Sequence, residues 1–219
     1  MSARNLFPPL GVCFLLLLAV PSAALGAAGT GATITFRKIF KMSYPEFVEI
    51  KVNESGRGTF EIRQLDEESD PQPLDIGAAE VGKIFDLAKK LNYFRGVDLD
   101  VHRRIANLGQ KTFRYESGGV ANEVTFNYTL DQNATQLLDA FEGVARLETD
   151  LSDIQRTMRY DRLGVSDTLK QIETDYDDKL LSEPERLLPV LDKLAADEKF
   201  IDIARQRARA LANRIRSDH

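Results

Sequence analysis

The sequence has few of the residues that carry redox, nucleophilic or metal chemistry. Its 219 residues include one cysteine and two histidines. The cysteine, Cys13, lies in the N-terminal segment, so the rest of the chain can form no internal disulfide and offers no thiol nucleophile. The sequence also lacks a glycine-rich phosphate loop and any zinc-ligand spacing. We therefore expect a domain that is stabilised by an ordinary apolar core.

The scarcity of histidine also limits the possible enzyme mechanisms. His219 is the last residue, and a frayed terminus cannot be held in catalytic geometry. A histidine-based dyad or triad would therefore have to use His102. Ser117 lies nearby in the sequence, but in a turn without the nucleophile-elbow pattern. We do not expect histidine-based hydrolysis.

The N-terminal residues follow the order of a secretory signal peptide. One positive charge, Arg4, precedes an apolar run over residues 10–20, and a series of small residues follows. A membrane-spanning helix needs about 20 predominantly apolar residues, which this run does not reach. We predict cleavage after Gly26, with Ala24 and Ala28 as alternative last residues. The mature domain would then be exported to the periplasm or the extracellular space.

A linker over residues 27–32 is followed by a region of strand-like alternation over residues 33–130. Apolar and polar residues alternate in five segments, at residues 34–40, 47–52, 59–63, 111–116 and 120–128. Glycines at 56, 58, 118 and 119 mark two hairpin turns. An apolar stripe over residues 78–91 predicts one helix that packs on the sheet.

From residue 131 to residue 219 the apolar period changes from two to about 3.6 residues. This change predicts a long helix over 134–159, a second helix after Ser166, a third after Glu183 and a last helix over 200–216. Strands followed by helices favour an α+β fold, with an antiparallel sheet, one packed helix and a C-terminal all-helical segment.

One cluster has the composition of a metal site. Asp98, Asp100 and His102 alternate with apolar residues, so an extended chain would place all three on one face. The alternative is a solvated polar face without a ligand. The remaining acidic clusters, at residues 66–70 and 175–178, match no calcium-loop spacing, and we interpret them as a loop and a solvated helix face.

Arginines gather in the last helix, although the chain as a whole has a net charge of -5. They are interpreted as a solvated face, or as a contact with an anionic surface through Arg205, Arg209 and Arg216. No aromatic residues are interleaved with them, and we therefore expect no nucleic-acid partner.

Three segments together resemble an uncharacterised family of bacterial exported proteins. They are residues 45–50, the turn at 56–59, and residues 97–115. The resemblance covers most of the mature chain. It implies a bacterial source and export, and it implies no activity.

These observations predict an exported, non-enzymatic domain that binds an unknown protein or small ligand of the cell envelope, without a cofactor. The alternative is a metal-dependent or carboxylate-based envelope hydrolase centred on Asp98, Asp100 and His102.

Overall fold

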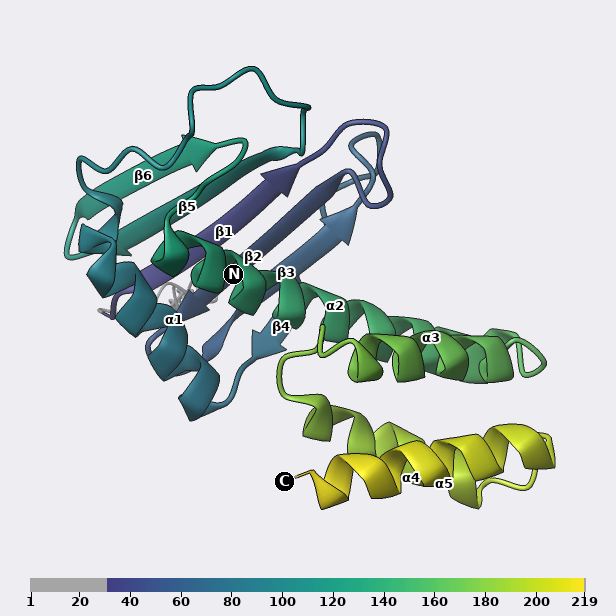
Figure 1. The fold of residues 1–219 in the computed structure, drawn as a ribbon. Coiled ribbons are helices and arrows are strands. Elements are labelled where there is room, and N and C mark those ends of the chain that lie inside the picture. The colour runs from purple at the N-terminus through teal and green to yellow at the C-terminus, as the bar shows by residue number, and fades with distance from the viewer. Residues whose placement is uncertain (1–30, 219) are drawn as a thin grey trace, which may run out of the picture.

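The computed structural model describes residues 31–218, and the predicted signal peptide and Cys13 lie outside this range. The protein has the α+β fold that the sequence predicts, with a six-stranded antiparallel sheet followed by helices (Figure 1). The strands are β1 (Thr33–Ile39), β2 (Phe47–Asn53), β3 (Arg57–Arg63), β4 (Gln72–Asp75), β5 (Gln110–Ser117) and β6 (Val120–Phe126). The helices are α1 (Ala78–Lys90), η1 (Asn92–Phe94), α2 (Gln132–Tyr160), α3 (Val165–Asp177), η2 (Pro184–Leu187), α4 (Leu188–Ala196) and α5 (Asp202–Ser217).

The sheet has the strand order β4-β3-β2-β1-β5-β6, so the first strand lies near its centre. Phe36 pairs with Ile50 on one side and with Phe113 on the other. Because side chains alternate between the faces of a strand, this register gathers the apolar residues of all the central strands on one face.

Two segments differ from the simplest interpretation of the sequence. The acidic segment 66–70 and the two prolines that follow it favour a loop over residues 66–73, but the end of this segment enters β4, where Pro73 is opposite Thr59. Proline is tolerated there because β4 is an edge strand, and its missing N–H interrupts no further ladder. Residues 97–102, which alternate like a strand, form a connection without strand pairing.

Two helices cover the apolar face of the sheet. Figure 1 shows α1 and the first half of α2 across the same side of the strands. The buried residues of this sheet core include Ile84 of α1 together with Leu137 and Phe141 of α2. The sequence predicted only the helix at 78–91 on the sheet, because it could not show that the long helix folds back over the strands.

A second core lies among the helices beyond the sheet. Its buried residues include Ile154 of α2, Ile172 of α3, Leu191 of α4 and Leu211 of α5. Helix α2 therefore contributes to both cores. The predicted boundary at residues 130/131 marks the change from strands to helices, whereas the cores meet further along, within α2.

The segment before η2 joins the two parts of the molecule. The carboxylate of Glu183 accepts a 2.7 Å hydrogen bond from the backbone N–H of Gly77, the N-cap of α1, which has no side-chain cap of its own. The N–H of Ser182 donates to the carbonyl of Gly143 in α2. A side chain at Gly143 would come within 2.7 Å of the Ser182 hydroxyl oxygen, so glycine permits this close approach.

Candidate functional site

The described helices leave the second face of the sheet uncovered. Between residues 31 and 218 both helices that touch the sheet pack on its apolar face. The alternate positions of the strands point to the other side and carry charged and hydroxyl side chains. We call this the open face, and it includes Thr35, Arg37, Glu49, Lys51, Thr112, Arg114, Glu116, Glu123 and Thr125.

Ion pairs between neighbouring strands order the side chains of the open face. Arg37 of β1 donates from Nε to Glu49 of β2 at 2.7 Å, and its second nitrogen lies 2.6 Å from the same oxygen. On the other side of β1, the hydroxyls of Thr112 and Thr125 lie 3.0 Å apart. Such cross-strand pairs fix rotamers on an exposed surface, and each contributes modestly to stability.

A second group of charges lies on β5 and β6. Arg114 donates to Glu116 at 2.9 Å and to Glu123 at 3.4 Å. These hydrogen bonds raise the pKa of the Arg114 guanidinium, and the bond from Arg114 lowers the pKa of the Glu116 carboxyl. Arg114 and Glu116 therefore both stay charged over the physiological pH range.

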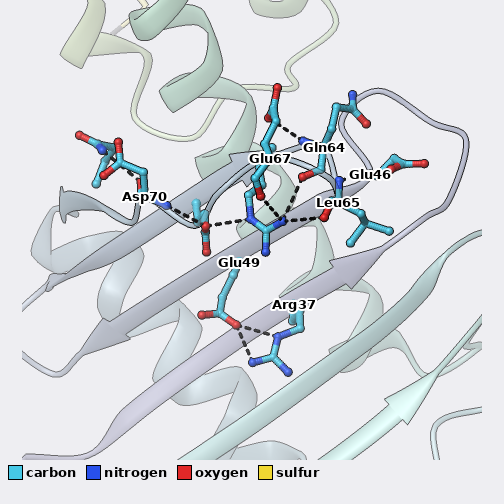
Figure 2. A network of polar contacts seen from close by, with 10 residues as sticks. Arg37, Glu46, Glu49, Gln64, Leu65, Glu67 and Asp70 are labelled. Atoms are coloured by element: carbon cyan, nitrogen blue, oxygen red, sulfur yellow. Dashed lines mark hydrogen bonds and ion pairs between the residues drawn. The ribbon is translucent and has the colours of Figure 1, made fainter.

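The β3–β4 connection, residues 64–71, closes one side of the open face (Figure 2). Arg63 donates to the carbonyls of Gln64, Leu65 and Glu67, and its Nε donates to Glu61 at 2.9 Å. Burial alone would raise the pKa of Glu61, but hydrogen bonds from Ser69, Arg63 and the N–H of Asp70 lower it instead. Glu61 is therefore a buried structural anion that holds this loop.

The open face is suited to recognition by charge and shape. Its acids and bases are paired with one another, and the pKa shifts of Arg114 and Glu116 stabilise the charged forms. A general acid or base needs a pKa near the working pH, which requires the opposite kind of environment.

The structure brings together the three residues of the predicted metal site, in the connection that precedes β5. His102 Nε2 lies 2.6 Å from Asp98 Oδ2, and its Nδ1 lies 3.9 Å from Asp100 Oδ2. About two thirds of the Asp98 and His102 side chains is exposed, at 68% and 69%. The hydrogen bond with Asp98 raises the pKa of His102 and lowers that of Asp98.

Asp100 has a structural role in this connection. Its Oδ1 accepts from the backbone N–H groups of Asn127 at 3.2 Å and Tyr128 at 3.3 Å. It also lines a cavity of about 310 Å³ beside Asn107 and Gln110. Over residues 31–218 no group of three or more His, Cys, Asp or Glu side chains has an arrangement that could hold a metal ion. The metal site stays a prediction.

The arginines of α5 have partners within the chain. Arg216 pairs with Asp192 at 2.6 Å, and Arg205 lies 4.0 Å from Asp202. Arg209 donates to the carbonyl of Ala195 at 3.3 Å. Arg207 and Arg214 pair with Glu173 and Asp177 of α3. The helix surface is therefore a network of ion pairs, and its contact with an anionic surface stays a prediction.

The structure contains a buried carboxyl pair between α2 and α3 that no sequence pattern indicates. Asp150 is 4% exposed and Asp175 is 1% exposed. The interpretation of residues 175–178 as a solvated helix face was therefore wrong for Asp175, whereas Asp177 and Asp178 are exposed. Arg146 lies 3.6 Å from Asp175, and Gln171 donates to it at 3.2 Å. Burial and the neighbouring Asp175 raise the pKa of Asp150 to about 7, against the opposing effect of Arg146.

Comparison with known proteins adds no relative. No family model matches the chain, and no curated protein sequence matches it. None of the helices in residues 31–218 is both long and apolar enough to cross a membrane. Function therefore has to be argued from the surfaces themselves.

Proposed function

We propose that this protein is an exported, non-enzymatic module that binds a protein or ligand of the cell envelope through the open face of its sheet. The observation that carries the proposal is the one-sided covering of the sheet by α1 and α2. A sheet needs only one buried face for stability, so the other face is available for contact. Export rests on the order of the N-terminal residues and on the resemblance to a bacterial exported family.

The charges of the open face support binding because they are already ordered. Arg37 and Arg114 are each held by carboxylates on neighbouring strands, so a partner need not immobilise them. Complementary charge gives such a surface selectivity and a fast approach.

Charge reversal on the open face tests the proposal. The tagged mature domain would be used for affinity capture from an envelope extract, as wild type, as R37E/R114E and as R156E/R159E. The last variant makes the same charge change on the exposed side of α2. We expect R37E/R114E to reduce the recovered partner about tenfold or more, because like charges across an interface are strongly unfavourable. Equal recovery with all three folded variants would exclude the open face as the contact.

A second candidate is a metal-dependent or carboxylate-based hydrolase, based on the proximity of His102 to Asp98 and Asp100. A metal would have to rearrange these side chains, since among the described residues no such group is placed to hold one. Thermal unfolding with saturating Zn²⁺, Mn²⁺ or Ca²⁺ separates the two proposals. A bound metal raises the melting temperature, and H102A would abolish that rise. An unchanged melting temperature with every metal would remove the basis for the metal-dependent form of this candidate.

A further inference from the structure

Large apolar side chains protrude at one end of the sheet, beyond the open face. The β1–β2 connection, residues 40–46, exposes 97% of Met42 and 90% of Tyr44, and the β3–β4 connection exposes 37% of Leu65. Both connections lie at the end of the sheet where β1 terminates (Figure 1). We call Met42, Tyr44 and Leu65 the end patch.

The backbone that carries the end patch is ordered by its own hydrogen bonds. The N–H of Phe40 donates to the carbonyl of Glu46 at 2.8 Å, and the Ser43 hydroxyl lies 2.6 Å from the carbonyl oxygens of both Phe40 and Pro45. The exposed side chains therefore extend from a turn whose backbone is fixed by hydrogen bonds.

Glu46 couples the two connections. Its Oε1 accepts from the N–H of Met42 at 2.6 Å. Its Oε2 accepts from the N–H of Leu65 at 3.3 Å, and Figure 2 shows these two residues side by side. One carboxylate thus sets the spacing of the end patch. A preorganised apolar surface loses little conformational entropy on binding, and tyrosine and methionine are enriched at protein interfaces.

The charge around the end patch indicates the kind of partner. The connections 40–46 and 64–71 contain one cation, Lys41, and five acids, Glu46, Asp66, Glu67, Glu68 and Asp70. The carboxylates of Asp66, Glu68 and Asp70 make no ion pair with any residue in the described part of the chain. Such a rim repels anionic lipid and attracts a basic surface.

We propose that the end patch docks a protein whose apolar pocket is rimmed by lysine or arginine side chains. Tyr44 and Met42 would enter the pocket, while Asp66 and Glu68 would face its cationic rim. This inference rests on the proposed binding function, but it names another surface and the chemistry of the partner.

Site-specific photocrosslinking tests the inference in the source cells. The probe is p-benzoylphenylalanine, placed in the full chain at position 42 or 44 for the end patch, at 112 or 125 for the open face, and at 160 as an exposed aromatic control on α2. We expect one protein adduct of the same mass from positions 42 and 44, and none of that mass from 160.

Charge reversal decides whether that adduct reports the proposed contact. D66K/E68K should reduce it about tenfold or more. E54K/E198K, which makes the same charge change at exposed sites elsewhere, should leave it intact. The purified partner should bind the mature domain more weakly as salt rises, and Y44A should abolish binding without changing the melting temperature.

The outcomes separate the two proposals. Adducts from 112 and 125 but not from 42 and 44 would overturn the end patch and leave the open face standing. No specific adduct from any of the four positions would overturn both. A lipid adduct, an adduct of two copies of this chain, or one indifferent to D66K/E68K would overturn the partner chemistry that we propose.

Discussion

The sheet part and the helical part of this protein differ in where they place their charges. The sheet core is rich in aromatic rings, and Phe113 contacts the rings of Phe36, Phe94, Phe126 and Phe141 with centroids 5.3 to 6.2 Å apart. Most charged side chains of the strands lie on the open face, and the two that are buried, Glu61 and Lys111, are held by hydrogen bonds. The helical core is aliphatic apart from Phe200, and three buried acids lie at its edges, Glu148, Asp150 and Asp175.

This difference follows from the way in which strands and helices distribute polar residues between the core and the surface. A strand separates its polar and apolar residues by simple alternation, which places most of its charge on the open face. The exception is Lys111, which has the parity of Phe113, is buried and donates to three backbone carbonyls. Helices that cross one another bury positions near the edge of each apolar stripe, and polar residues there need a partner. Arg186 supplies one by donating to Glu148 at 2.6 Å. Both parts contain a buried ion pair, Glu61 with Arg63 in the sheet and Glu148 with Arg186 among the helices. Only the helical part also buries two neighbouring carboxyls, Asp150 and Asp175, so its stability should depend more strongly on pH.

The largest effect should come from the aromatic core of the sheet. Phe113→Ala removes a fully buried ring at the centre of the cluster. We expect a loss of about 3–5 kcal/mol in the free energy of unfolding, as for other buried aromatic truncations. Chemical denaturation measures this loss, and Val120→Ala on the exposed edge of β6 is the control.

The same variant tests the coupling between the two parts. Since α2 is one continuous helix in both cores, Phe113→Ala should also increase amide hydrogen exchange in α4, in the helical part. Unchanged exchange in α4 would mean that the helical part opens independently. The sheet part and the helical part would then be two separate folding units.

The second effect is a pH dependence that belongs to the helical part. Asp150 binds its proton more tightly in the folded chain, because burial and Asp175 outweigh Arg146. Its contribution to stability is therefore complete below its unfolded pKa near 4 and is lost as the pH rises through about 7. Each pKa unit corresponds to about 1.4 kcal/mol, so we expect a loss of roughly 2 kcal/mol between about pH 5 and pH 8.

Asp150→Asn isolates this contribution, because asparagine cannot ionise. The unfolding free energy of the variant, measured by urea denaturation across the same pH range, should vary less than that of the wild type. Asp178→Asn, an exposed acid at the end of α3 that does not contribute to the pKa shift of Asp150, should keep the wild-type slope. An identical slope in D150N would show that other groups cause the pH dependence.

A smaller effect should come from the joint between the parts. Glu183→Ala removes the carboxylate that accepts from the Gly77 N–H at the start of α1. Loss of a helix cap costs typically about 1 kcal/mol, and Glu198→Ala on an exposed turn should cost less. Both variants can be compared by thermal unfolding. Equal stability would show that the Glu183 carboxylate does not stabilise the joint and that the contacts of Ser182 hold it.

The fold was predictable where one residue pattern fixes the structure. Alternation located five of the six strands, and the 3.6-residue period located the long helix within a few residues of its observed ends. It missed β4, because four residues with a single buried side chain, Leu74, carry almost no pattern.

The open face could also be inferred, since residues such as Glu49 and Lys51 occupy the alternate positions of a half-buried strand. The contacts that depend on tertiary structure could not be inferred from the sequence. Gly77 and Glu183 are 106 positions apart, and only the packing of α2 against α3 shows that Asp150 and Asp175 meet.

The smallest change in stability should come from the arginines of α5. Their clustering is visible in the sequence, but their partners are seen only in the structure. Arg216 and Asp192 are each about half exposed, and exposed ion pairs contribute about 0–1 kcal/mol. We expect R205Q/R209Q/R216Q to change the unfolding free energy by at most about 1 kcal/mol. Co-sedimentation with phosphatidylglycerol vesicles, against phosphatidylcholine vesicles, then tests the predicted anionic contact. If the triple variant binds anionic vesicles as well as the wild type does, these arginines serve only contacts within the chain.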